Sequence, residues 1–127
     1  MHVEGEAVPP SAYIRRLERL DASIERMFVM TDHHGQFAAL RKLAPELEVT
    51  TLSEPAMRGY FQADFRRLPY DRRLASIRRL MAEVLVASRA KAFIGAFRSN
   101  VSRMVYMLHP DKARCVSIDS MTEWIAE

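Results

Sequence analysis

The chain has 127 residues, of which 49% are hydrophobic and 28% charged, and its formal net charge is +3. This balance is typical of a folded domain with a buried core and excludes a disordered or fibrous chain. No apolar run approaches the roughly 20 residues that span a bilayer. The acidic start, Met1 to Glu6, lacks the basic and apolar parts of a secretory signal, and the single Cys115 allows no internal disulfide. We therefore predict one cytoplasmic domain over residues 1–127 with no transmembrane segment.

The basic residues are arranged as arginine pairs rather than as a nucleic-acid-binding motif. The pairs occupy positions 15–16, 66–67, 72–73 and 78–79. Most fall on the polar sides of amphipathic segments, and neither zinc-finger spacing nor an RNA-binding aromatic strand accompanies them. His33 and His34 have no partner at ligand spacing. We predict no nucleic-acid partner and no metal site.

The first half of the chain predicts helices and strands in alternation. Ser11 is placed to cap a helix in which four apolar residues recur at helical spacing, Ile14, Leu17, Leu20 and Ile24. Residues 27–30, Met-Phe-Val-Met, form a continuous apolar run that is typical of a parallel strand covered on both faces. A helix that starts near Gly35 and ends at Pro45 follows, and the β-branched residues within 48–52 predict a second strand. This order predicts a doubly wound α/β fold.

The second half predicts an irregular loop followed by a helix, a strand and another helix. Proline and glycine interrupt residues 53–70, which we expect to form a long surface loop with at most a short helical turn. From Asp71 an amphipathic helix begins, and its apolar stripe consists of Leu74, Ile77, Met81, Val84 and Leu85. Residues 92–94 predict a short buried strand, after which helical spacing resumes as far as Leu108. A final strand over residues 114–118 and a terminal helical piece with Trp124 complete the chain.

Polar residues follow two of these strands at the positions where α/β folds bind ligands. Thr31 and Asp32 end the first strand, and Arg98, Ser99 and Asn100 lie where a later helix begins. The unpaired N–H groups of a helix N-terminus form a ready site for phosphate. Short polar residues also serve as ordinary helix caps, which is the alternative at both positions.

The residues in these segments resemble the motifs of a known enzyme family. Phe93-Ile94-Gly95, followed by Ser99-Asn100-Val101-Ser102-Arg103, resembles the last motif of the fucosyltransferases related to the α-1,6 enzymes. Residues 28–32, Phe-Val-Met-Thr-Asp, resemble the strand of that family that ends in Thr-Asp. Glu83 falls where the family has an acidic residue that contacts the guanine base. The resemblance extends from about residue 6 to the end of the chain.

The resemblance implies that residues 1–127 are the C-terminal donor-binding domain of a GT-B glycosyltransferase, a Rossmann-like parallel sheet flanked by helices. It implies transfer of fucose from GDP-fucose to a hydroxyl of a glycan acceptor, with inversion and with neither a metal nor another cofactor. Glu6 is the implied catalytic base, and Glu4 is the alternative. The implied donor-binding residues are Thr31, Asp32, Glu83, Arg98, Ser99, Asn100 and Arg103.

The sequence also departs from the family pattern. The first motif, an arginine-rich segment that contacts the donor diphosphate, would precede residue 1, as would the N-terminal half of the enzyme. We therefore expect either a partner that supplies this half or a homo-oligomer. Arg98 replaces the small hydroxyl residue usual at its position, which either adds a phosphate contact or blocks one.

Two functions from other classes remain open. A nucleotide-binding module without catalysis would bind GDP or GDP-fucose and never turn over. A protein-interaction domain would instead use the arginine-rich faces to bind an acidic partner in a salt-sensitive manner, and it would bind no nucleotide.

Overall fold

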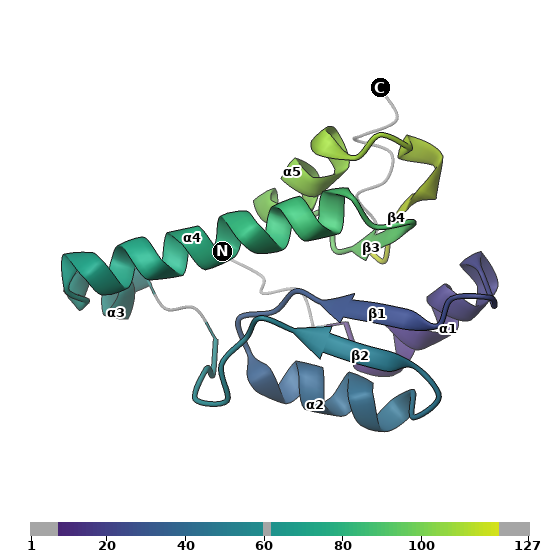
Figure 1. Cartoon of the computed structure of the whole chain (residues 1–127), viewed down its shortest axis with the longest axis horizontal. Coiled ribbons are helices and arrows are strands. Elements are labelled where there is room, and N and C mark those ends of the chain that lie inside the picture. The colour runs from purple at the N-terminus through teal and green to yellow at the C-terminus, as the bar shows by residue number, and fades with distance from the viewer. Residues whose placement is uncertain (1–7, 60–61, 120–127) are drawn as a thin grey trace, which may run out of the picture.

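Figure 1 shows a computed structural model of the protein, in which residues 8–59 and 62–119 are described. Over these ranges the fold is mixed α/β, with five α-helices and two parallel sheets of two strands each. The prediction of an α/β fold with parallel strands is confirmed at this level. The predictions for Glu6, for Glu4 and for the terminal helix around Trp124 lie outside the described residues. Within them, no helix combines the length and the apolar character that crossing a membrane requires.

The N-terminal half forms two helices and the first sheet. Its elements are, in chain order, α1 (Pro10–Leu20), β1 (Arg26–Val29), α2 (His34–Leu43) and β2 (Glu48–Thr51). β1 and β2 pair in parallel, with Arg26 opposite Glu48 and Val29 opposite Thr51. Both strands form where the apolar run at 27–30 and the β-branched residues at 48–52 predict them. Helices α1 and α2 pack against each other.

Helix α1 begins before the residue that we expected to cap it. Pro9 precedes the helix, and Pro10 lies in its first turn, where a proline loses no hydrogen bond. Ser11 therefore lies inside the helix, and the prediction that it caps the helix is wrong.

The C-terminal half forms the remaining helices and the second sheet. Its elements are α3 (Gln62–Arg67), α4 (Tyr70–Ser88), β3 (Phe93–Gly95), α5 (Asn100–Leu108), the 3-10 helix η1 (Lys112–Arg114) and β4 (Cys115–Ser117). β3 and β4 pair in parallel, with Phe93 opposite Cys115. The short α3 lies within the region that we expected to be mostly loop. Helix α4 packs on α5, and the core cluster at their contact consists of Val84, Ala87 and Val105, with Met30, Phe93 and Val101 packed against it.

The apolar stripe expected to bury α4 is only partly buried. Val84 is buried, whereas Ile77, Met81 and Leu85 are about half exposed. The buried side of the helix instead includes Glu83, one residue before Val84. Apolar residues occupy more than one side of this helix, and its contact with α5 decides which side is covered. The prediction of a single core-facing stripe is therefore wrong for these three residues.

One carboxylate connects the two sheets at the edge where their strands begin. Asp21, between α1 and β1, lies 3.1 Å from Lys91 Nζ and 3.0 Å from Arg114 Nη2. Lys91 closely precedes β3, and Arg114 immediately precedes β4. The strands of both sheets therefore begin at a common edge, and their carboxyl ends lie toward the opposite edge.

Candidate functional site

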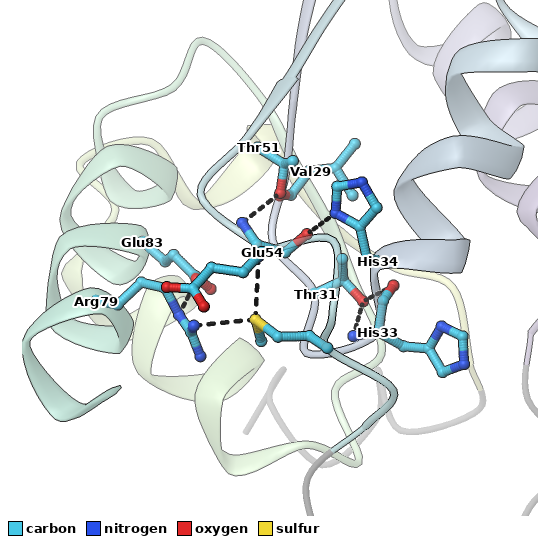
Figure 2. A network of polar contacts seen from close by, with 10 residues as sticks. Val29, Thr31, His33, His34, Thr51, Glu54, Arg79 and Glu83 are labelled. Atoms are coloured by element: carbon cyan, nitrogen blue, oxygen red, sulfur yellow. Dashed lines mark hydrogen bonds and ion pairs between the residues drawn. The ribbon is translucent and has the colours of Figure 1, made fainter. Parts of the chain in front are cut away.

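The carboxyl end of β1 continues into a tight polar turn that starts α2. Thr31 Oγ1 accepts a hydrogen bond from His33 N at 3.1 Å and donates one to His33 O at 3.2 Å (Figure 2). His33 caps α2, because its Nδ1 accepts from Gly35 N at 3.1 Å. The residue that caps this helix is thus neither Thr31 nor Asp32. Asp32 is exposed beside the turn, and its carbonyl accepts from Gly59 N at 2.9 Å.

A chain of hydrogen bonds joins the carboxyl end of β2 to the same turn. Thr51 Oγ1 donates to Val29 O at 2.7 Å and accepts from Ser53 N at 3.1 Å. The Ser53 hydroxyl, in turn, lies 2.9 Å from His34 Nδ1 (Figure 2). Sequence reasoning missed Thr51 and Ser53, although the rule that selected Thr31 and Asp32, polar residues at a strand end, applies to them equally. These hydrogen bonds hold the carboxyl ends of β1 and β2 together, and the polar residues there form one edge of the first sheet.

Glu83 is a buried carboxylate on α4 that faces this edge. Its exposed fraction is 5%, and its Oε1 lies 3.4 Å from Arg79 Nε. Arg79 Nη1 lies 2.9 Å from the sulfur of Met57, so that Arg79 stands between Glu83 and the loop after β2 (Figure 2). Burial raises the pKa of the Glu83 carboxyl, the Arg79 guanidinium opposes this rise, and the nearby Asp32 adds to it.

The turn before α5 is polar, exposed and tied to the segment after β4. Ser99 holds the cap position of α5 in an extended conformation, but its side chain makes no capping hydrogen bond in the described structure. Arg98 N donates to Asp119 Oδ2 at 3.0 Å, and Arg103 Nη2 donates to Arg98 O at 2.9 Å. Ser117 Oγ fixes the Asp119 carboxylate from the other side, at 2.7 Å. Sequence reasoning missed Asp119, because no local pattern links it to a turn about twenty residues earlier.

Gly95, the last residue of β3, and Phe97, two residues later, explain the shape of the turn before α5. A Cβ on Gly95 would come within 2.6 Å of the Phe93 ring and 2.8 Å of Ser102 Oγ, so any larger residue there would have to displace these side chains. Phe97 is 1% exposed and packs between Phe93, with ring centres 6.4 Å apart, and the edge-on ring of Tyr106 at 5.6 Å. Phe97 therefore anchors residues 98–100 to the core.

The three candidate segments surround one core cluster. Met30 directly precedes Thr31, Val84 directly follows Glu83, and Val101 lies in the first turn of α5, and all three belong to or cover the same cluster. The structure thus places the segment after β1, the buried side of α4 and the turn before α5 around the same cluster. Two cavities lie elsewhere: one of about 250 Å³ beside Leu17 and Ile24, and one of about 230 Å³ between α3 and α4. The candidate residues form a polar edge outside both cavities.

The remaining findings concern metal ligands and similarity to known proteins. Over residues 8–59 and 62–119, no three histidine, cysteine or acidic side chains come together in a way that would hold a metal ion. No protein-family model, curated protein or solved structure matches the chain.

Proposed function

We propose that the chain is the donor-binding part of a fucosyltransferase-like glycosyltransferase and that it binds GDP-fucose at the carboxyl ends of its parallel strands. The observation that carries this proposal is the buried Glu83, paired with Arg79 beside the core cluster that Met30 and Val101 also contact. Buried carboxylates are rare, and those with raised pKa values concentrate in functional sites. The parallel strands and the helices between them are compatible with the Rossmann-like half of a GT-B enzyme that the resemblance implies.

Glu83 has the chemistry that recognition of guanine requires. An ionised carboxylate accepts two hydrogen bonds, and the Watson–Crick edge of guanine presents two adjacent N–H donors. The ion pair with Arg79 opposes the rise in the pKa of Glu83 and so favours the ionised form. Uracil presents a single N–H between two carbonyl oxygens, which a carboxylate repels. Glu83 therefore distinguishes GDP from UDP.

The turn before α5 supplies donors for the diphosphate. The Ser99 hydroxyl makes no capping bond, and the first N–H groups of α5 follow it. Asn100 is exposed beside them, and Arg103 reaches over the turn to the Arg98 carbonyl. Because Asp119 accepts from Arg98 N, the diphosphate would bind to the later groups of the turn rather than to this amide.

In this proposal the protein stabilises the leaving diphosphate while a carboxylate removes the proton of the acceptor hydroxyl. The fucose then transfers to the acceptor oxygen with inversion, and no metal takes part. Glu6 stays the candidate base by resemblance.

Calorimetric titration with GDP, and with UDP as the comparison nucleotide, tests this function. We expect GDP to bind in preference to UDP. Glu83→Gln and Ser99→Ala should each weaken GDP binding by about tenfold or more, because each removes a hydrogen bond to a charged group. Glu18→Gln is the matched control, since Glu18 is an exposed carboxylate on α1. Equal binding of both nucleotides, or binding of neither, would refute the proposal.

One observation favours the protein-interaction alternative. Ile77, Met81 and Leu85 form an apolar ridge on α4 that is about half exposed, and the exposed Arg78 follows Ile77 in the same helix. Such a ridge suits an acidic amphipathic partner. In that case GDP would not bind, and association with the partner would weaken steeply with added salt.

A further inference from the structure

The cavity between α3 and α4 lies at the end of α4 that points away from both sheets (Figure 1). Phe65 of α3 forms one wall. The other wall is a single face of α4, because its residues follow one another at helical spacing: Tyr70, Arg73, Leu74 and Ile77. Leu68 N donates to Phe65 O at 3.1 Å and closes the turn between the two helices. The cavity is therefore built from one continuous stretch of chain, apart from the polar edge.

The lining of this cavity is apolar except for one charged group. Its members are aromatic or aliphatic, with the exception of Arg73. Ligand sites typically combine such a lining with a few polar groups that fix the orientation of the ligand. The volume is about 230 Å³. Since an apolar cavity of roughly 150 Å³ holds benzene, one aromatic ring with a small polar group fits here. Tyr70 is 72% exposed, so its side of the cavity opens to solvent.

Arg73 determines which charge the ligand should carry. Its Nε is buried, and over residues 8–59 and 62–119 this atom has no hydrogen-bond partner. The ion pairs found in the same part of the chain do not involve Arg73. A buried donor without a partner is costly and is therefore unusual in a native fold. A bound oxyanion would accept from this group, and a carboxylate matches the planar geometry of a guanidinium.

The surroundings of the cavity also favour an anion. Between residues 64 and 73, four arginines outnumber two aspartates. Arg66 and Arg67 follow Phe65 in α3, and Arg72 is exposed on α4. Among the described residues that line the cavity, none is acidic. The local field therefore attracts an anion and repels a cation.

We propose that this cavity is a binding site for a small aromatic carboxylate. The ring would lie against Phe65, Leu74 and Ile77, and the carboxylate would accept from Arg73 Nε. Burial of the ring supplies affinity, whereas the guanidinium selects an acid over its neutral analogue. The site shares no residue with the proposed donor site, so it does not rest on nucleotide binding.

The experiment follows the amide and methyl signals of the full chain by two-dimensional NMR during titration with phenylacetate. Phenylacetamide is the neutral analogue, and acetate lacks the ring. We expect phenylacetate to bind with a millimolar Kd and to shift the signals of Phe65, Leu74 and Ile77. Phenylacetamide should bind about tenfold more weakly, because it has no charge to pair with Arg73. The Kd of phenylacetate should be the same with and without GDP, which separates this site from the proposed donor site.

Three variants test the role of each part of the cavity. Arg73→Gln should weaken phenylacetate binding by about tenfold and leave phenylacetamide binding unchanged. Arg72→Gln is the matched control, because Arg72 is exposed and does not line the cavity, and it should change the Kd by about twofold or less. Tyr70→Ala should fold normally, since Tyr70 is 72% exposed. It should weaken both aromatic ligands alike, because both lose the same apolar contact.

Five results would overturn the proposal. Equal affinity for phenylacetate and phenylacetamide would show that Arg73 does not select the ligand. Equal losses in Arg73→Gln and Arg72→Gln would show attraction to a basic surface only. Acetate that binds as tightly as phenylacetate would show that the ring does not enter the cavity. Cavity signals that change on dilution without ligand would identify a second copy of the chain as the occupant. Cavity signals that stay unchanged at saturating phenylacetate would show that there is no site.

Discussion

Replacing Phe97 tests whether the turn before α5 is anchored as the structure shows. The Phe97 ring is almost fully buried between Phe93 and Tyr106, and the residues that follow it directly form the proposed diphosphate site. Phe97→Ala removes the ring and leaves a cavity, whereas Phe97→Leu keeps most of the volume and loses only the ring contacts.

The expected cost follows from this burial. Truncation of a buried phenylalanine to alanine costs about 3–5 kcal/mol of unfolding free energy, since it combines lost burial with a cavity. Loss of the edge-on contact with Tyr106 and of the stacked Phe93 contact should cost about 1–2 kcal/mol in Phe97→Leu. For a chain of this length, each kcal/mol corresponds to a fall of about 3–5 °C in Tm.

Urea and thermal unfolding, followed by circular dichroism, measure these costs. Met107→Ala is the matched control, because Met107 lies on α5 and is 73% exposed, and it should change stability by about 0.5 kcal/mol or less. If Phe97→Ala costs no more than Met107→Ala, then Phe97 is not buried and the anchoring of the turn is wrong.

Two further predictions concern pH. Burial raises the pKa of the Glu83 carboxyl above its ordinary value of 4.5. The neutral carboxyl therefore contributes to stability below pH 4.5, and this contribution is lost as pH rises through the raised pKa and the buried side chain ionises. Glu83→Gln should therefore be more stable than the wild type at pH 7 and equal to it in acid, and an unchanged urea midpoint at pH 7 would contradict this. The Ser23 hydroxyl and amide, together with Lys91 and Arg114, hold the pKa of Asp21 below its ordinary value of 3.8, so this contribution is present above that pH and is lost as pH falls below it. Asp21→Asn should have a lower Tm than the wild type at pH 7, and most of this difference should disappear at pH 2. If the difference in Tm is as large at pH 2 as at pH 7, the carboxylate is not its cause.

The contrast between these two carboxylates bears on the proposed function. Asp21 accepts hydrogen bonds from Ser23 and pairs with Lys91 and Arg114 at the edge where the strands begin, and these contacts lower its pKa. Glu83 is desolvated at the opposite edge, and its charge opposes folding. The presence of a carboxylate that lowers stability is more readily explained by binding of a ligand than by a role in the fold.

The secondary structure could be predicted largely because it depends on local pattern. The apolar run at 27–30, the β-branched residues at 48–52 and the break at Gly95 each specify an element through a few neighbouring residues. The strand-end rule likewise selected Thr31, Asp32 and Ser99 before their surroundings were known. The Ser11 cap failed, because Pro10 starts the helix one position earlier.

What only the tertiary structure decided is which residues meet. The contacts of Asp119 with Arg98 and of Ser53 with His34 join positions about twenty residues apart, and no local pattern encodes them. The covered side of α4 depends on where α5 packs, so Glu83 is buried and Met81 is half exposed. Strand pairing is equally non-local, since hydrogen-bonding groups are the same in every strand. The sequence by itself therefore predicted the four strands and most of the helices, and only the tertiary structure decided that β1 pairs with β2 and β3 with β4, because pairing depends on which backbones the fold brings together.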